Sequence, residues 1–267
     1  MPTTTPKRRF YYFNRAITIA GEDGFAALVK AIARFLDYKS NHFLSRVYFS
    51  AFKKPVIKNL KKFNTSDNEI LFDFISKEFM RVFAPIQIKE EFLELLNIFK
   101  EKNPKTIVEI GTARGGTLFC WCKLASNEAT IIGIDLPSTM RVVQVVNFPF
   151  FFQSFTKEGQ KLYLLREDSH SEKTLELLKG ILNGQKIDFL FIDGDHSYEG
   201  VKKDFEMYSP LVDKGGIIAF HDINPNGAKE WKCDVPDFWK EIKDNHLNKE
   251  FINDENQRLF GIGILFL

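Results

Sequence analysis

Short apolar segments alternate with amphipathic ones over the second half of the chain. The apolar segments are rich in Ile, Val, Leu and Phe and are too short for helices, as in strands that helices cover on both faces. Between them, residues 172–182 and 199–208 are predicted helices. This alternation predicts an α/β fold with a doubly wound, mainly parallel sheet. The predicted strands are residues 106–110, 130–134, 161–166, 187–192 and 216–220.

The first part of the chain predicts several helices, after residues 1–6, which we expect to be disordered. From residue 24 onward, apolar side chains such as Phe25, Leu28 and Ile32 recur at helical spacing, with Lys30 and Arg34 between them. A second aromatic and basic cluster, HFLSRVYFSAFKKPVIKNLKKF, is interrupted at its proline. Residues 68–83 and 89–100 predict two more helices, and Asn-Pro follows the second. We therefore divide the chain into a basic helical extension, residues 1–103, and a catalytic domain, residues 104–267.

Charge is distributed unevenly between these two parts. Residues 1–62 hold 13 Lys and Arg against 3 Asp and Glu, a net charge of +10 within a chain of +2, which leaves −8 for the remainder. A basic amphipathic arm with aromatics is typical of peripheral contact with an anionic membrane surface. A helical cap over the catalytic domain or a dimerisation arm explains it as well, and we expect a homo-oligomer. The sequence contains no recognisable nucleic-acid-binding module, so no nucleic-acid partner is expected.

The three cysteines, Cys120, Cys122 and Cys233, are too few and too scattered for a disulfide framework, which indicates a reducing compartment. The apolar stretch after the basic residues 7–9 is interrupted by Asn14 and Arg15, unlike a cleavable signal peptide. No apolar run is long enough to span a bilayer. We expect a cytoplasmic protein, with membrane association through the basic arm.

A phenylalanine-rich connection follows the second predicted strand. It contains Phe148, Phe150, Phe151, Phe152 and Phe155. Two interpretations fit such a segment: buried packing of a crossover helix, or a mobile lid over an active site.

The segment 106–117, TIVEIGTARGGT, predicts a buried strand, a glycine turn and the start of a helix. Glycines at such a turn let a ligand approach the backbone, and the free N–H groups of the helix start favour an anionic or nucleotide-like group. A dinucleotide loop requires G-x-G-x-x-G, but Ala113 replaces the middle glycine here. NAD is therefore disfavoured, and an ordinary strand-to-helix turn remains the plain alternative.

This pattern resembles the first motif of class I S-adenosylmethionine-dependent methyltransferases, E/D-x-G-x-x-x-G, in a Rossmann-like fold. The resemblance implies that Glu109, Gly111, Thr112, Gly115 and Gly116 hold the amino-acid end of the cofactor. Asp135 ends the next strand, 24 residues after Gly111, where a carboxylate is placed to accept both ribose hydroxyls. At the end of the third strand, Asp168 and Ser169 match the family's adenine-contacting position.

Polar residues also follow the fourth and fifth predicted strands directly. Asp193, Asp195 and His196 come after residues 187–192, and His221 and Asp222 come after residues 216–220. Ligands of doubly wound sheets bind at the carboxyl ends of the strands. We therefore expect these side chains to gather on the same rim as Gly111 and Asp135.

The phrases FIDGDHSYEGVKKDFEMY, LVDKGGIIAFHDI and GIGILFL resemble the small-molecule O-methyltransferase branch that includes cephalosporin-hydroxylase-like and sugar or macrolide O-methyltransferases. The resemblance covers residues 104–267 and implies a seven-stranded methyltransferase sheet that ends in an antiparallel hairpin, residues 250–253 and 261–267. Metal-dependent relatives hold a hard cation at positions that match Asp193 and His221–Asp222. One expected acid is thus a histidine, which puts the identity of a metal in question.

The predicted function is S-adenosylmethionine-dependent methyl transfer to a hydroxyl of a sugar, glycolipid or secondary metabolite, with a small-molecule or glycan acceptor. We assign His196 as general base, His221 as ligand or orienting group, and Asp193 as catalytic and cofactor-binding residue. Asp193, His221 and Asp222 would bind Mg2+ or another divalent cation. Asp195 and Tyr198 are weaker candidates, Trp231 could line the acceptor pocket, and Trp239 is expected to pack a helix on the sheet. A nicotinamide oxidoreductase and a non-catalytic cofactor-binding protein are the alternatives.

Overall fold

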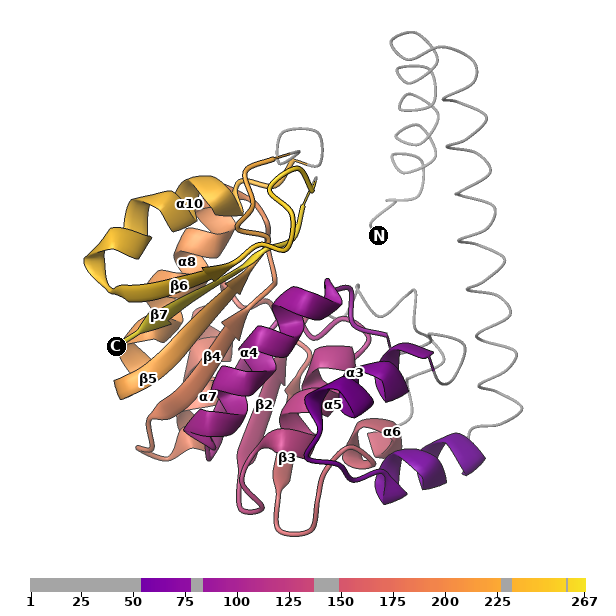
Figure 1. Cartoon of the computed structure of the whole chain (residues 1–267). Coiled ribbons are helices and arrows are strands. Elements are labelled where there is room, and N and C mark those ends of the chain that lie inside the picture. The colour runs from indigo at the N-terminus through magenta and orange to yellow at the C-terminus, as the bar shows by residue number, and fades with distance from the viewer. Residues whose placement is uncertain (1–53, 78–83, 137–148, 227–231, 258) are drawn as a thin grey trace, which may run out of the picture.

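The structure is a computed structural model that describes residues 54–77, 84–136, 149–226, 232–257 and 259–267 (Figure 1). The basic arm up to residue 53, the first part of the phenylalanine-rich connection and Trp231 lie outside the described residues. The predictions of membrane contact and of a role for Trp231 therefore stay predictions. Among the described helices, none has both the length and the apolar character needed to cross a bilayer.

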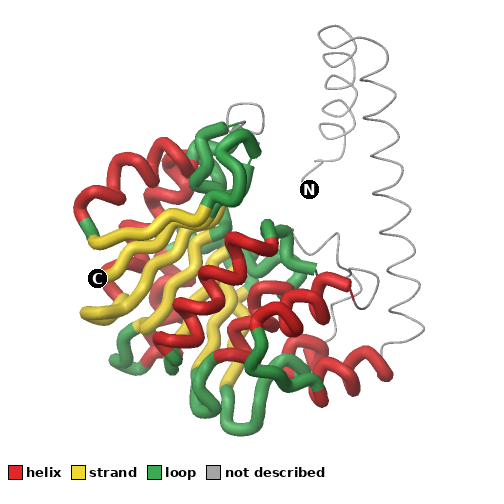
Figure 2. The backbone as a smooth tube through the Cα atoms, viewed as in Figure 1, coloured by secondary structure: helices red, strands yellow, loops and turns green. Residues whose placement is uncertain are grey.

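Seven strands form one sheet in the order β3-β2-β1-β4-β5-β7-β6. The first five are parallel, and β7 pairs antiparallel with both β5 and β6 (Figure 2). This confirms the seven-stranded sheet and its C-terminal hairpin, but the first strand of the hairpin spans residues 247–251 rather than the predicted 250–253. The strands are β1 (Thr106–Ile110), β2 (Thr130–Ile134), β3 (Lys161–Leu165), β4 (Ile187–Ile192), β5 (Val212–His221), β6 (Leu247–Phe251) and β7 (Ile262–Phe266).

Strand β5 is longer than the sequence predicts, because it begins at Val212 rather than at Gly216. The predicted strand covered only residues 216–220. Gly215 takes a φ of +78°, and the pairing with β4 shifts register between Ile187 and Phe189. The two glycines thus allow an irregularity inside the strand.

Helices cover both faces of the sheet (Figure 1). On one face lie α3, α4, α5 and α6, and on the other lie α7, α8 and α10. Their bounds are α3 (Asn68–Lys77), α4 (Lys89–Lys102), α5 (Gly116–Leu124), α6 (Pro149–Gln153), α7 (Glu172–Leu182), α8 (Tyr198–Tyr208) and α10 (Val235–Ile242), with short 3-10 turns η4 (Ser209–Leu211) and η5 (Lys243–Asn245).

Each face of the sheet has its own hydrophobic core, because neighbouring strand residues point to opposite sides. In β1, Ile107 belongs to the core under α4 and α5, while Val108 belongs to the core under α7 and α8. The aromatic share of the first core is large: the Trp121 ring lies 4.7 Å from that of Phe99 and 5.1 Å from that of Phe189. This burial on both faces confirms the prediction of a doubly wound sheet.

The end of the phenylalanine-rich connection is packed, as the crossover interpretation expects. Phe151, Phe152 and Phe155 are all buried around α6 in the core that α5 covers. Trp239 of α10 is also buried and lies against Gly263 of β7, where an added Cβ would come within 2.8 Å of the indole. These four aromatic side chains therefore help to pack α6 and α10 against the sheet.

Residues before the proposed domain boundary share the core of the sheet. Residues 54–62 are helical, and Val56 and Leu60 are buried against the core that contains Ile107. Phe92 of α4 lies in the same core. A test of the basic arm by truncation should consequently remove residues 1–53 and keep residues 54–62.

Candidate active site

The turn after β1 brings two loops into direct backbone contact. Gly111 has a φ of +93°, and a Cβ at this position would lie 1.9 Å from the carbonyl oxygen of Asp193. Only glycine allows this approach. Ala113, which stands where a dinucleotide loop has glycine, also takes a left-handed φ of +40°. Helix α5 starts immediately after this turn, at Gly116, with Gly115 as its left-handed N-cap.

Asp135 at the end of β2 holds the same turn from the other side. Its buried carboxylate accepts the backbone N–H of Ala113 at 2.6 Å and the hydroxyl of Thr112 at 3.3 Å. The side chain predicted to bind a ribose therefore also orders the glycine turn.

A cavity of about 430 Å3 lies at the carboxyl ends of β1, β2, β3 and β4. Four residues that we predicted to bind the cofactor line it: Gly111, Asp135, Asp168 and Ser169. Asp193, the fifth, closes it on the β4 side. The structure thus brings together residues from four separate strand ends that the sequence predicts to bind the cofactor.

A second, larger cavity of about 650 Å3 adjoins the first. The two share Gly111, Ala113, Asp193 and His196. The predicted residues Thr112 and Gly116 line only the larger one. Two segments distant in sequence form much of its remaining wall, and their side chains are largely apolar: Ala84, Pro85, Ile86, Gln87 and Ile88, and Gln257, Leu259 and Phe260.

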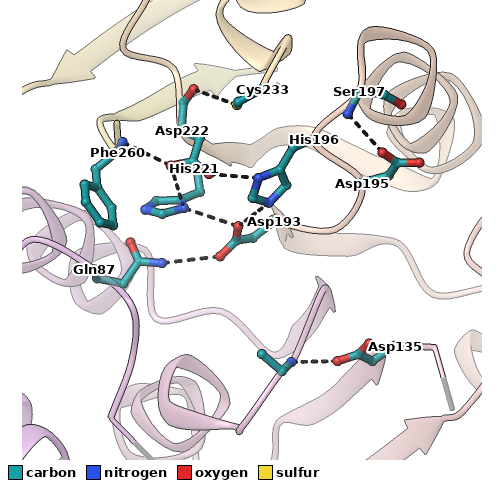
Figure 3. Close-up of polar contacts among 11 residues, drawn as sticks. Gln87, Asp135, Asp193, Asp195, His196, Ser197, His221, Asp222, Cys233 and Phe260 are labelled. Atoms are coloured by element: carbon teal, nitrogen blue, oxygen red, sulfur yellow. Dashed lines mark hydrogen bonds and ion pairs between the residues drawn. The ribbon is translucent and has the colours of Figure 1, made fainter. Parts of the chain in front are cut away.

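A cluster of carboxylates and imidazoles lies where the two cavities meet (Figure 3). Asp193 Oδ1 is 3.2 Å from Nδ1 of His221 and 3.5 Å from Nε2 of His196. Nδ1 of His196 is 3.1 Å from Oδ2 of Asp222. The amide of Gln87 donates to Asp193 Oδ2 at 3.3 Å. The gathering of these four acids and histidines, predicted from the ends of β4 and β5, is therefore present in the structure.

The charges in this cluster stabilise one another. Burial raises the pKa of Asp193, but the charge of His221 and hydrogen bonds from both histidines outweigh it and lower this pKa to about 2. Hydrogen bonding to Asp193 and Cys233 raises the pKa of His196 to about 11. Burial lowers the pKa of His221, yet the charge of Asp193 prevails and raises it. His196 thus carries a proton at neutral pH, so its predicted role as a base requires that this proton first be removed.

Asp222 is fixed by its own backbone and by a loop from the C-terminal hairpin. Its φ is +64°, a left-handed value that is uncommon for a residue other than glycine. The N–H of Phe260 donates to its Oδ1 at 3.0 Å. That loop is tied to α4 through Glu91, which is buried and accepts the N–H groups of Asn253 and Gly261, each at 2.9 Å. A chain of hydrogen bonds thus connects α4 with Asp222.

Glu109 lies beneath the glycine turn and lines neither of the two described cavities. It is fully buried, and its Oε1 accepts hydrogen bonds from Thr117 and from the indole of Trp121. Burial raises its pKa to about 8 although these two bonds lower it. The structure therefore places this predicted cofactor residue under the site, in contact with α5.

Replacing Glu109 with Gln is expected to flatten the dependence of stability on pH. The carboxyl group has an ordinary pKa of 4.5 and a folded value of about 8, so the folded protein holds a proton that the unfolded chain releases. Stability is therefore lost as pH rises through this window, by up to about 5 kcal/mol. Urea unfolding at pH 5 and pH 8 should show a larger fall for the wild type than for the variant. Equal falls in both proteins would contradict a neutral Glu109.

Two weaker candidates have structural roles. The exposed carboxylate of Asp195 accepts the N–H of Ser197 at 2.9 Å, and the hydroxyl of Ser197 accepts the N–H of Gly200 at the start of α8. The hydroxyl of Tyr198 donates to Glu241 on α10. Both side chains order the start of α8 and its contact with α10.

Sequence reasoning missed Gln87, Glu91, Cys233 and Phe260. These residues lie outside the strand-end motifs, and the turns and loops that carry three of them show no periodicity. Cys233 offered a signal that we discounted: it is the cysteine nearest in sequence to the acidic and histidine motifs. It is buried and lines the larger cavity with His196 and Asp222.

Residues 108–223 match the family described as "Methyltransferase domain". Protein R132 of Acanthamoeba polyphaga mimivirus, whose name calls it uncharacterized, is 38% identical over 128 residues, which cover 48% of this chain and 55% of the viral one. The uncharacterized protein y4gI of Sinorhizobium fredii is 24% identical over 151 residues, 52% of this chain and 15% of that protein. The chain thus spans about half or less of the curated relatives it matches.

Solved structures show the same fold. A putative caffeoyl-CoA O-methyltransferase from Staphylococcus aureus has a TM-score of 0.53 at 18% identity, with 84% of this chain and 99% of that chain covered. An O-methyltransferase from Bacillus cereus, solved with S-adenosylhomocysteine, has a TM-score of 0.50 at 14% identity, with 77% and 93% covered. At these identities the likeness establishes the architecture of the sheet and its helices.

Proposed function

We infer that this chain, whose residues 108–223 match a methyltransferase family, transfers the methyl group of S-adenosylmethionine to a hydroxyl oxygen of a small-molecule acceptor. The observation that carries this proposal is the meeting of two cavities at Asp193 and His196. One cavity is suited to a nucleoside and the other to an apolar acceptor. A group transferred from one ligand to the other would cross this shared wall.

The smaller cavity is suited to the cofactor. Asp135 ends β2, where a carboxylate can accept ribose hydroxyls, and Asp168 and Ser169 lie beside it at the end of β3. The family match begins within β1 and runs beyond β5, so it includes all four strands that line this cavity. The resemblance in the glycine turn supports S-adenosylmethionine as the occupant.

The larger cavity favours an acceptor with an apolar body. Ile86, Ile88, Leu259 and Phe260 line its walls, and its acids and histidines gather on one side. A free sugar would leave several hydroxyls unpaired against these apolar walls, at a cost of about 1–3 kcal/mol for each buried group. We therefore favour a glycolipid or secondary metabolite that presents one hydroxyl to the cluster.

The reaction is an in-line displacement. A lone pair of the acceptor oxygen forms a bond to the methyl carbon, the carbon–sulfur bond breaks, and its electrons stay on sulfur as S-adenosylhomocysteine is formed. The hydroxyl proton must leave the acceptor oxygen. Because Asp193 and His196 line both cavities, the carboxylate–imidazole cluster is the part of the site that can align the acceptor and remove this proton.

Calorimetric titration with S-adenosylhomocysteine and, separately, with NADH tests the cofactor. We expect a dissociation constant on the order of micromolar for S-adenosylhomocysteine and no measurable heat for NADH. Ala113 supports this choice, because it stands where a dinucleotide loop has the glycine that lets the backbone approach a pyrophosphate. Binding of NADH would favour an oxidoreductase instead, and binding of neither ligand would overturn the proposed function.

A further inference from the structure

Cys233 lies beside the carboxylate–imidazole cluster, on the wall of the larger cavity (Figure 3). It is 3% exposed, and its Sγ is 3.9 Å from the backbone oxygen of Asp222. One side-chain donor atom from each of His196, Asp222 and Cys233 lies within 4.8 Å of the other two. A nitrogen, an oxygen and a sulfur thus meet at one place.

A hard cation such as Mg2+, which the resemblance to metal-dependent relatives implies, does not suit this set of donors. Mg2+ requires near-octahedral oxygen ligands. A second group of potential metal ligands in the cluster consists of Asp193, His221 and Asp222. Both groups together supply two carboxylates, two imidazoles and one thiol. One carboxylate oxygen, Oδ1 of Asp222, already accepts the N–H of Phe260 at 3.0 Å.

The surroundings of His196 are those of a metal-binding imidazole. Its Nδ1 faces Oδ2 of Asp222 at 3.1 Å, while its Nε2 faces Oδ1 of Asp193 at 3.5 Å. Histidines that bind metals almost always direct their other ring nitrogen to a carboxylate or carbonyl, which fixes the ring. Gln87 in turn donates to the far oxygen of Asp193 at 3.3 Å. Asp193 and Gln87 therefore already hold the His196 ring in the way that residues around a metal site hold a ligand histidine.

We propose that His196, Asp222 and Cys233 bind a divalent transition-metal ion of the zinc class. Zn2+ accepts nitrogen, oxygen and sulfur, and its catalytic sites commonly use three protein ligands. All three side chains line the cavity proposed for the acceptor, where such an ion would act as a Lewis acid toward a hydroxyl. A His196 that binds metal through Nδ1 is a ligand and not the general base, so the proposal replaces that earlier assignment.

Cobalt titration of the full chain, after removal of metals with a chelator, tests this proposal without any methyl transfer. A cobalt–thiolate bond produces a charge-transfer band in the near ultraviolet, which nitrogen and oxygen ligands do not produce. We expect the wild type to show this band on addition of one Co2+ per chain. Cys233→Ser should abolish the band and weaken Co2+ binding by at least about 10-fold. Cys122→Ala, in the core on the other face of the sheet, should retain it.

Two results with the wild-type protein would overturn the proposal. One is the absence of a charge-transfer band on addition of Co2+, and the other is displacement of Co2+ by an equal concentration of Mg2+. The proposal also fails if the band persists in Cys233→Ser or in Cys233→Ala. Melting curves by circular dichroism show which of these variants keeps the wild-type fold. Because the titration needs neither cofactor nor acceptor, its failure is separate from a failure to bind S-adenosylhomocysteine.

Discussion

Asp193→Asn is expected to lower the rate of methyl transfer by about 100-fold or more, the lower end of what positioned acid–base groups contribute. Asp193 and Asp222 each contact both imidazoles of the described cluster, and of these two carboxylates Asp193 alone lines both cavities. Its backbone N–H donates to the carbonyl of Ile110 at 2.9 Å, a bond that the substitution leaves intact. The fold should therefore survive, while His196 and His221 lose one of the two carboxylates that orient them, the one that faces both cavities.

The measurement is release of S-adenosylhomocysteine, with an acceptor found by screening hydroxylated apolar compounds. Asp213→Asn is the matched control: it makes the same chemical change on an exposed carboxylate of β5 that lines neither of the two described cavities. It should retain activity within a few-fold. Affinity for S-adenosylhomocysteine separates two roles of Asp193. Unchanged affinity assigns its side chain to the reaction, whereas a large loss would assign it to cofactor binding.

Glu91→Ala is expected to lower the free energy of unfolding by about 3 kcal/mol or more. The buried carboxylate accepts the backbone N–H groups of Asn253 and Gly261 and the side-chain amide of Gln257. Without it these donors lose their acceptor, at about 1–3 kcal/mol for each donor that stays buried. Urea unfolding measures the loss. Glu90→Ala, an exposed neighbour on the same helix, is the control and should change stability by less than about 0.5 kcal/mol.

The same variant should affect the two ligands differently. The loop that Glu91 holds contributes Gln257, Leu259 and Phe260 to the larger cavity and none of the residues of the smaller one. We therefore expect a higher KM for the acceptor and nearly unchanged affinity for S-adenosylhomocysteine, in protein that melts well above the assay temperature. Loss of cofactor affinity to the same extent would indicate a general disturbance of the fold.

Sequence predicted the sheet well because its parallel strands are buried on both faces and so read as plain apolar runs. Strands β1, β2 and β4 have the bounds that the pattern gives. Strand β5 was predicted too short, because its glycine pair forms an irregularity inside the strand rather than a turn. The pattern of apolar and polar residues did not by itself predict the C-terminal hairpin. That prediction rested on the family resemblance.

For the candidate site, the sequence predicted the residues that follow the strand ends. It did not predict the residues that reach the site from loops and turns. Asp193, His196, His221 and Asp222 gather because topology places the ends of β4 and β5 side by side. Gln87 and Phe260 reach the cluster from segments whose paths depend on tertiary contacts, such as the bond from Glu91 to Gly261. The protonation state of His196 was equally out of reach, because it depends on distances to two carboxylates.

Two segments that form much of the apolar wall of the larger cavity, residues 84–88 and residues 257, 259 and 260, both lie outside the span 108–223 that matches the methyltransferase family. Under the proposed function, the apolar walls that would select the acceptor and the residues that would hold the cofactor are thus encoded in separate stretches of the gene. Relatives could exchange one stretch while preserving the other, so acceptor preference can diverge faster than cofactor use. For engineering, a library confined to these two short segments would search new acceptors without touching the residues predicted to hold S-adenosylmethionine.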